Sequence, residues 1–367
     1  MLRLAIVGGG IGGLASAVAL TQAGHRVDVF EQAVAFRTVG TGITLSPNAV
    51  RVLDSLDLGS EIRGRAHRPP NRVNREWDTG ETTSVVELGA TAEQKYGAPL
   101  LCMHRADLLS ALMGAVGTQS VHLGKRLVGI DAGADVKLIF ADGEVLSADG
   151  LIGADGIHSS VRKLLLGEDE PRFRGIVAYR TVVPVSQLSK VEVGPFIKWW
   201  SNQPEREVVA VPIGGERMYA QVTSPSEEWV QESWSMKDNG DGAREAVSGF
   251  HEAAREMFDV SGEVLVSALY DRDPIASWAQ EHIALLGDAC HPMLPFMGQG
   301  AAMALEDAAV LARCLLGDPD DVPEAFREYE RARRARVERV QSLSRLNVWG
   351  KQPPDVEWVY GYDATDG

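Results

Sequence analysis

The first 31 residues carry the pattern that most constrains the fold of this chain. An apolar run, "LRLAIV", is followed by a glycine cluster in which Gly8, Gly10 and Gly13 have the spacing GxGxxG. The next run, "LASAVALTQA", has helix-forming composition, and Gly24 is suited to end that helix before a second apolar run, "RVDVFE". A strand, a glycine-rich turn, a helix and a strand make a βαβ unit, and this unit predicts a site for a dinucleotide.

Glu31 ends the second predicted strand, about 20 residues after the glycines, where dinucleotide-binding units place an acidic group. The glycines let the backbone approach a pyrophosphate, and the following helix directs its N-terminal partial positive charge toward it. Glu31 can accept hydrogen bonds from ribose hydroxyls but would repel a 2′-phosphate. The unit therefore favours FAD or NAD over NADP, without distinguishing a flavin from a nicotinamide.

Size and charge narrow the class of protein. The chain has 367 residues, 45% of them hydrophobic, which is enough for one large domain or two coupled ones. Acidic residues outnumber basic ones by 51 to 36, so long-range attraction to nucleic acid is disfavoured. A basic run at 327–345 contains interleaved glutamates and apolar residues, and we interpret it as a helix with a solvated face.

Neither a membrane segment nor a cysteine site is indicated. The sequence has no apolar run of about 18 residues and no signal-peptide pattern at its start, so we expect a cytoplasmic protein that does not enter a membrane. The three cysteines, Cys102, Cys290 and Cys314, are far apart and form no CxxC pair, which favours free thiols over disulfides or zinc. No metal site is expected.

The middle of the chain has a different pattern. Short apolar runs such as "IVAYRTVVPV", "GPFIKWWS", "EVVAVPI" and "MYAQVTS" lie between about 173 and 226, and their spacing predicts an antiparallel sheet. Helical composition at 241–258, a buried-strand run "HIALLG" and two helices follow, whereas the aromatic, turn-rich end favours no helix. We expect four parts: 1–171, the first part of a dinucleotide domain; 172–272, a substrate domain with the antiparallel sheet; 273–350, the second part of the dinucleotide domain with C-terminal helices; and 351–367, a tail.

Two later stretches identify the family. "DGLIGADGIHSSVR" and "IALLGDACHPMLPFMGQGAAMALEDA" follow the N-terminal glycines in an order that resembles the FAD-dependent aromatic hydroxylases, single-component monooxygenases that include salicylate, para-hydroxybenzoate and 6-hydroxynicotinate hydroxylases. The resemblance covers nearly the whole chain. It implies an α/β fold like that of para-hydroxybenzoate hydroxylase: a Rossmann-like FAD-binding domain, an inserted antiparallel β-sheet substrate domain and C-terminal helices.

The resemblance also implies roles for individual residues. Asp288 would accept a hydrogen bond from the ribityl chain of FAD, and Arg105 would reach its phosphates or ribityl chain. Asp155, with Gly156, would fix the geometry of a loop that serves FAD and the nicotinamide donor. The residues implied to bind FAD are Gly8, Gly10, Ile11, Gly12, Gly13, Glu31, Gln32, Gly42, Ile43, Thr44, Arg105, Leu127, Asp155, Asp288, Gly298, Gly300 and Ala301.

The family reaction needs no metal and no protein nucleophile, because the cofactor carries the chemistry. NADH or NADPH reduces FAD, the flavin captures O₂ as a C4a-hydroperoxide, and its distal oxygen goes to a phenolic or N-heteroaromatic ring, which we expect to carry a carboxylate. Pro295, Gly298, Gln299 and Gly300 would form the wall beside the reacting edge of the flavin, and a helix from about Ala301 would direct its amides at the ring. No catalytic side chain is identified, and the protein would be a monomer or a homodimer.

Two other functions remain open. A flavin oxidoreductase of the same fold could epoxidise or dehydrogenate a non-phenolic substrate. A nucleotide-sensing or partner-binding module would keep only the βαβ unit, but Asp155 and Asp288 would then have no reason to be present.

The substrate is the least constrained part of the prediction. Segments such as "IKWWS" and "EWVYGYD" resemble the 6-hydroxynicotinate 3-hydroxylase branch most, yet Thr44 and Phe296 stand where that branch has histidines. The loss of two imidazoles removes groups suited to a phenolic proton near neutral pH. The residues that could line the substrate site are Arg180, Trp200, Tyr219 and Phe296, followed by Lys198, Arg206, Tyr179 and Trp199. We interpret His104, Cys290 and His291 as packed residues rather than catalytic ones.

Overall fold

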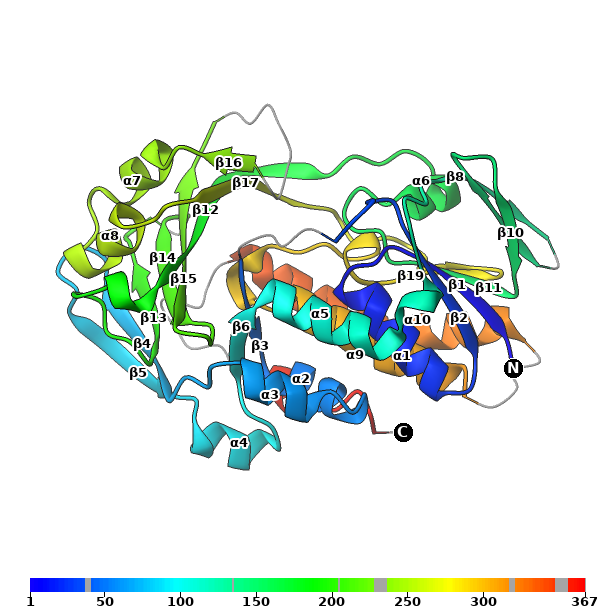
Figure 1. Ribbon diagram of the computed structural model, residues 1–367, viewed down its shortest axis with the longest axis horizontal. Coiled ribbons are helices and arrows are strands. Elements are labelled where there is room, and N and C mark those ends of the chain that lie inside the picture. Colours follow the sequence, from blue (N-terminus) through cyan, green and yellow to red (C-terminus); the bar gives the residue numbers. More distant parts are fainter. Residues whose placement is uncertain are drawn as a thin grey trace.

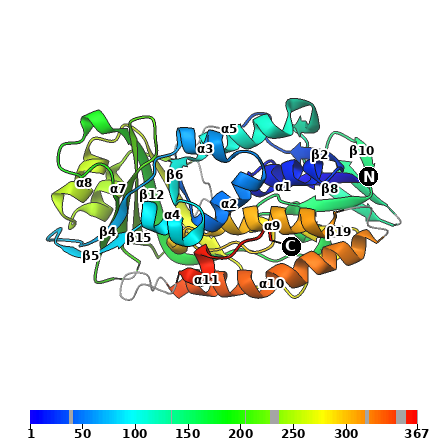
Figure 2. The ribbon, with the colours of Figure 1, turned by 90° about the horizontal axis from the view of Figure 1, so that it is seen from below.

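A computed structural model describes residues 1–36, 41–133, 135–203, 205–227, 236–316, 321–346 and 356–366. Figure 1 shows a large sheet with two helices on its outer side at one end of the molecule, and an α/β layer built on a parallel sheet at the other. The N-terminus lies in the α/β layer. In Figure 2, the helices formed by the end of the chain run beneath this layer toward the large sheet. Among the described residues, no helix is long and apolar enough to cross a membrane.

The α/β layer contains the predicted βαβ unit. Its sheet has the strand order β18 (Ala279–Gln280), β19 (Ile283–Leu285), β11 (Gly150–Gly153), β1 (Arg3–Val7), β2 (Arg26–Glu31) and β7 (Val121–Leu123). All neighbours are parallel except β18 and β19. The helices around it are α1 (Ile11–Gln22), α5 (Arg105–Val116), α9 (Gly300–Cys314) and α10 (Val322–Leu346), and α1 packs against both α5 and α9. Two segments separated by more than a hundred residues therefore contribute to one parallel sheet.

Smaller elements complete this half of the molecule. A three-stranded sheet consists of β8 (Leu127–Ala132), β9 (Val136–Phe140) and β10 (Val145–Ala148), and a two-stranded sheet of β3 (Gly42–Leu45) and β6 (Leu101–His104). The short helices are α2 (Pro47–Ser55), α3 (Gly59–Arg65), α4 (Ala90–Tyr96) and α6 (Ser160–Leu166), and the 3₁₀ turns are η1 (Thr118–Ser120), η3 (Gly287–Ala289) and η4 (Pro295–Met297). A further 3₁₀ turn, η2 (Val185–Gln187), follows β12 at the large sheet.

The large sheet has eight strands among the described residues. Their order is β16 (Met236–Asp238), β17 (Val264–Asp271), β12 (Arg172–Pro184), β15 (Arg217–Pro225), β14 (Glu207–Pro212), β13 (Phe196–Trp200), β4 (Asn71–Glu76) and β5 (Thr82–Glu87). All pairs are antiparallel except β13 with β4. The four runs named in the sequence form β12 to β15, but β4 and β5 come from the range 1–171, outside the segment predicted for the substrate domain. A long-range parallel pairing of this kind leaves no local signal in the sequence.

The two faces of the large sheet differ in chemistry. Trp199, Met218 and Val222 belong to an apolar cluster with the outer helices α7 (Asp241–Val247) and α8 (Glu252–Asp259). Side chains alternate along a strand, so Trp200 and Tyr219, the neighbours of two of these residues, face the α/β layer and join its core. The sheet thus turns an apolar face to α7 and α8 and a more polar face to the dinucleotide domain.

The end of the chain forms a helix that the sequence does not predict. The segment 356–366 contains a short helix, α11 (Glu357–Tyr360), although its turn-rich composition favours none. Tertiary contacts hold it: the Arg336 guanidinium donates to the carbonyl oxygens of Trp358 and Val359 at 2.8 and 2.9 Å, and the Arg339 guanidinium lies 3.9 Å from the centre of the Trp358 ring. These contacts override the weak local preference.

Candidate functional site

The N-terminal glycine turn is too tight for side chains at two of its positions. Gly8 has a φ of +112°, and a Cβ there would lie 2.3 Å from the Ala154 carbonyl oxygen. A Cβ on Gly13 would lie 2.0 Å from the carbonyl oxygen of Gly8. By contrast, a Cβ on Gly10 would meet nothing within 4 Å, and no side chain caps the start of α1 there. The turn therefore leaves the amides at the N-terminus of α1 open to an anionic ligand.

Glu31 and Gly12 stand on either side of this turn. The carboxylate of Glu31 accepts hydrogen bonds from the amides of Gly9 and Ala33, both at 2.8 Å, one on each oxygen. A carboxylate has about four acceptor positions, so Glu31 keeps acceptors for ribose hydroxyls. A Cβ on Gly12 would instead lie 2.7 Å from the Leu286 side chain, so this glycine is needed where α1 meets the segment before α9.

Asp288 and Arg105 lie near each other on two different segments, η3 and the start of α5. Asp288 is exposed to solvent, yet burial among protein atoms raises the pKa of its carboxyl, and His291 and Arg105 oppose the rise only in part. The Asp288 carboxylate is therefore close to protein atoms and still reachable from solvent. Neither side chain makes a hydrogen bond with any described residue, so both are available to a ligand.

Asp155 serves the protein backbone. Its carboxylate accepts hydrogen bonds from the Ser159 hydroxyl and from the amides of Ser160 and Val161, the latter two at 2.6 and 3.2 Å, at the start of α6. Nearby, the buried guanidinium of Arg162 donates to the Cys290 carbonyl oxygen at 3.1 Å. This loop is thereby joined to the segment after Asp288, while the service of Asp155 to FAD and the nicotinamide donor stays a prediction.

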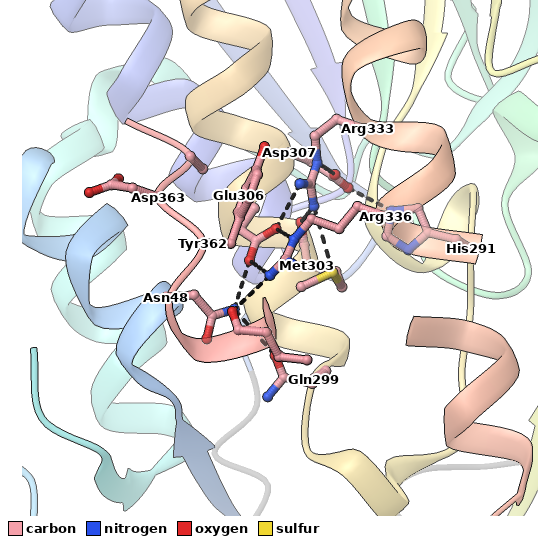
Figure 3. Close-up of polar contacts among 12 residues, drawn as sticks. Asn48, His291, Gln299, Met303, Glu306, Asp307, Arg333, Arg336, Tyr362 and Asp363 are labelled. Carbon is pink, nitrogen blue, oxygen red and sulfur yellow. Dashed lines mark hydrogen bonds and ion pairs between the residues drawn. The ribbon is translucent and has the colours of Figure 1, made fainter. Parts of the chain in front are cut away.

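The segment 287–300 is fixed from behind by buried charges on α9 and α10 (Figure 3). The imidazole of His291 lies 2.6 Å from an Asp307 oxygen, which also accepts from the Gly287 amide at 3.2 Å, and Arg333 pairs with the other oxygen at 2.8 Å. Burial raises the pKa of the Cys290 thiol well above its ordinary value. Cys290 is thus a neutral, packed thiol and His291 a structural partner of Asp307, as the sequence suggests.

The strand β3 brings the predicted flavin-facing residues to the large sheet. A Cβ on Gly42 would lie 2.6 Å from the Tyr219 ring, so the glycine lets β3 approach β15. Ile43 and Thr44 follow it, and the Thr44 hydroxyl lies 3.8 Å from the Cys102 sulfur. Leu127, also predicted to contact FAD, is buried in the core of the α/β layer.

Arg180 is at the centre of the polar face of the large sheet. Its Nε donates to Gln221 Oε1 at 3.0 Å, and its Nη1 donates to the Ser267 hydroxyl. Gln221 Oε1 also accepts from the Tyr219 hydroxyl at 3.1 Å. Burial raises the pKa of Tyr219, opposed by the Arg180 charge, so the phenol stays protonated near neutral pH.

A second polar group lies farther along the same face. Lys198 Nζ is 2.8 Å from a Glu207 oxygen and 3.8 Å from the centre of the Trp200 ring, and both charged side chains are buried. The Trp200 indole donates to Asn74 Oδ1 at 3.0 Å. Burial lowers the pKa of the Lys198 ammonium, opposed by the Glu207 charge, and burial also lowers the pKa of neighbouring Arg72.

Phe296 joins the loop to the sheet. It is buried in a small apolar cluster with Ile176, Ala178, Leu269 and Leu294, at the end of the sheet face that holds Arg180. This apolar cluster keeps water out of the contact between the segment 287–300 and the sheet.

Three residues that the sequence suggests for the substrate site face the outer helices α7 and α8 instead. Trp199 packs against α7 and α8. The Tyr179 hydroxyl lies so close to Gly242 of α7 that a Cβ on this glycine would be 2.6 Å from it. The Arg206 guanidinium donates to the carbonyl oxygen of Ala246 on α7 at 2.9 Å. His104 caps α5 by accepting from the Ala106 amide at 3.2 Å, which agrees with a packed residue.

Gln221, Arg72 and Asn74 also lie on the polar face, but they were not predicted from the sequence as residues of the substrate site. Gln221 could have been predicted, because it follows Tyr219 by two residues on one strand and therefore shares its face. Arg72 and Asn74 give no such signal, since only the pairing of β4 with β13 brings them to this face.

The residues fit a dinucleotide such as FAD. The uncapped amides at the start of α1 can bind a pyrophosphate, and Glu31 can accept hydrogen bonds from a ribose. Asp288 and Arg105, whose side chains make no hydrogen bond with a described residue, can bind a ribityl chain and phosphates. Within the described ranges, no three His, Cys, Asp or Glu residues are grouped so as to hold a metal ion.

Comparisons with known proteins agree with this chemistry. The family described as "FAD binding domain" matches residues 1–344. The chain is 37% identical to 6-hydroxynicotinate 3-monooxygenase of Pseudomonas fluorescens, covering 99% of this chain and 95% of that protein, and 35% identical to 3-hydroxybenzoate 6-hydroxylase of Klebsiella oxytoca, covering 99% and 97%. Among solved structures, a salicylate hydroxylase substrate complex has a TM-score of 0.83 at 26% identity, covering 99% and 96%. Klebsiella pneumoniae HpxO with FAD and uric acid has a TM-score of 0.85 at 26% identity, covering 98% and 92%.

Proposed function

Because the chain belongs to the FAD-binding family of aromatic hydroxylases and is a flavin-dependent monooxygenase, we propose that it uses NADH or NADPH and hydroxylates a phenolic or N-heteroaromatic ring that carries a carboxylate. One observation carries the finer part of this proposal. The large-sheet face toward the segment 287–300 holds the buried guanidinium of Arg180 and the half-buried Arg72, beside Lys198, which is already paired with Glu207. Charged groups are costly to bury, and an anionic ligand in the same space offsets part of that cost.

The named relatives support the same class. Hydroxynicotinate, hydroxybenzoate and aminohydroxybenzoate, in the names of proteins 33–38% identical to this chain, all combine a ring hydroxyl with a carboxylate. The substrate of this chain need not be one of them, because Thr44 and Phe296 stand at positions where the hydroxynicotinate branch is expected to have histidines.

The side chains of the polar face can divide the work of binding. We assign the carboxylate to Arg180, whose planar guanidinium suits it. Gln221 Oε1 is committed to Arg180 and Tyr219, so the Gln221 Nε2 group is left to donate to a ring substituent. Tyr219 stays a neutral phenol that can exchange hydrogen bonds without taking a charge. Bound FAD would supply the reduction and the oxygen transfer, and the cluster around Phe296 would keep water away.

A substrate screen tests the proposal. Purified protein with FAD is given NADH or NADPH and matched pairs of rings, such as 4-hydroxybenzoate with phenol and 6-hydroxynicotinate with 2-hydroxypyridine. Oxidation of the nicotinamide, H₂O₂ and hydroxylated product are measured together. We expect at least one carboxylated ring to accelerate oxidation and to yield product, and its partner without the carboxylate to be weaker.

Arg180→Gln sharpens this test. Loss of one charge-assisted contact should raise the KM of the carboxylated ring by roughly 10- to 150-fold and leave that of its neutral partner nearly unchanged. Arg206→Gln, on the outer face of the same sheet, is the matched control and should change neither. Oxidation that no hydroxyaromatic acid stimulates would refute the proposal and favour an oxidoreductase acting on a non-phenolic substrate.

A further inference from the structure

A row of buried polar contacts joins the C-terminal segment, residues 356–366, to the start of α9 (Figure 3). Arg336 on α10 holds the segment by donating to the carbonyl oxygens of Trp358 and Val359 at 2.8 and 2.9 Å. The same guanidinium binds the Glu306 carboxylate through two contacts, Nε to Oε2 and Nη2 to Oε1, both 2.8 Å. One side chain therefore bridges the end of the chain and α9.

The row of contacts continues from Glu306 to Gln299 in the segment 287–300. Asn48 Nδ2 on α2 donates to Glu306 Oε1 at 2.7 Å and lies 3.2 Å from Gln299 Oε1. Gln299 Nε2 then donates to the Ser46 hydroxyl at 3.0 Å and is 3.5 Å from the Met297 carbonyl oxygen. Glu306 and Asn48 are completely buried and Gln299 is 1% exposed, so water does not compete for these bonds. Gln299 ends the loop that runs from Asp288 past Phe296.

The charge of Glu306 fixes which way both amides point. A carboxylate accepts hydrogen bonds only, so Asn48 must turn its Nδ2 group toward Glu306. Asn48 Oδ1 is buried and accepts no hydrogen bond from a described residue, a cost that the contact with Glu306 offsets. Because Asn48 donates to Gln299 Oε1, the Gln299 amide is oriented in turn. Each amide has two discrete orientations, which allows a change at Glu306 to reach the loop.

We infer that the C-terminal segment positions the flavin-edge loop through Arg336, Glu306 and Asn48, which hold the Gln299 amide in one orientation. Arg336, Glu306 and Asn48 are positioning residues and touch no substrate. The inference rests on FAD binding and on the placement of 295–300 beside the flavin, and it does not depend on which ring is hydroxylated.

The test uses the full-length protein loaded with FAD and three variants: Asn48→Ala, Arg336→Lys and a deletion of 356–367. The visible circular dichroism of bound flavin reports its surroundings, FAD titration gives the affinity, and the share of NAD(P)H that ends as H₂O₂ reports the closed site. We expect all three variants to change the dichroism in the same way and to weaken FAD binding by roughly 2- to 30-fold. Asn48→Ala combined with the deletion should show no more than the larger single effect, because both act through one route.

Arg313→Ala is the matched control. Arg313 also holds the C-terminal segment, by donating to the carbonyl oxygens of Ala364, at 3.0 Å, and Asp366, but it makes no contact with Glu306 among the described residues. This variant should leave the flavin spectrum unchanged. Additive effects of Asn48→Ala and the deletion would overturn the inference, as would an unchanged spectrum in both Arg336→Lys and the deletion. If the deletion does not fold, Arg336→Lys decides alone. Failure of every aromatic acid to react would refute the proposed substrate class but leave the dichroism and FAD titration interpretable.

Discussion

Replacing Asp288 by asparagine should have opposite effects on the protein with and without FAD. The pKa of the Asp288 carboxyl is raised mainly by burial. A carboxyl whose pKa is higher in the folded than in the unfolded state destabilises the fold as pH rises above its ordinary value of 3.8 and through the raised value. The penalty grows as the pH rises above 3.8 and is complete once the pH exceeds the raised pKa. Asp288→Asn removes the ionisable group, so the apoprotein should unfold at a higher temperature than the wild type at pH 7, and the difference should vanish near pH 3.

The effect on FAD follows from hydrogen bonding. A bond to a charged group contributes about 1.5–3 kcal/mol and a neutral bond about 0.5–1.5 kcal/mol. Asparagine keeps the shape and one acceptor, so it should cost about 1–1.5 kcal/mol, or roughly tenfold in the Kd of FAD. Alanine keeps no acceptor and should cost the whole bond, roughly 10- to 150-fold.

The assay is a titration of apoprotein with FAD, followed by flavin fluorescence, beside thermal unfolding without FAD at several pH values. Asp142→Asn is the control, because Asp142 pairs with Lys125 at the surface. It should leave FAD binding unchanged. Asp288→Asn protein that binds FAD as tightly as the wild type would refute the assignment of Asp288 to the ribityl chain. If the Asp288→Asn apoprotein unfolds at a lower temperature than the wild-type apoprotein at pH 7, burial of the Asp288 carboxylate does not destabilise the fold.

Three further predictions concern buried groups. Asp307→Asn removes one of the two carboxylates that pair with Arg333 and should lower the free energy of unfolding in urea by about 1.5–3 kcal/mol, because Glu306 still pairs with Arg333 at 2.7 Å; a loss below about 0.5 kcal/mol would show that the Asp307 contact is not isolated from water. Lys198→Met should also destabilise because it removes the cation paired with the buried Glu207 carboxylate at 2.8 Å, and the double variant with Glu207→Gln should regain most of the loss in the same measurement. Burial raises the pKa of Cys102 to about 12, so this thiol should not react with a disulfide reagent at pH 8 until the protein unfolds, and rapid labelling of the native protein would contradict its placement.

The parts of the fold that the sequence predicts best are those with local signals. The glycine spacing and the two flanking apolar runs specify β1, α1 and β2 within one stretch of chain, and the structure confirms each. Alternating short runs likewise predict β12 to β15. The pairing of β4 with β13 and the helix α11 escape prediction, because contacts between distant segments determine both.

The candidate site shows the same division. Glu31 and Asp288 could be proposed as FAD ligands because one ends and the other follows a strand in a recognisable motif, and their contact with FAD stays a prediction. For the large sheet, composition identified aromatic and basic residues but not their faces, and the face decides their use. Trp199 and Trp200 are adjacent in sequence, yet only Trp200 lies on the polar side, where Lys198 covers its ring. The register of one strand thus separates core residues from site residues.

The charges on α9 and α10 explain how a loop rich in proline and glycine can hold a fixed shape. A segment of this composition has few backbone bonds of its own, and between Asp288 and Gln299 it forms only the short turns η3 and η4. Its order has to come from outside. Asp307 anchors the segment at one end through His291 and the Gly287 amide, and Glu306 anchors it at the other through Asn48. Two adjacent acidic residues of one helix, Glu306 and Asp307, therefore fix opposite ends of the segment.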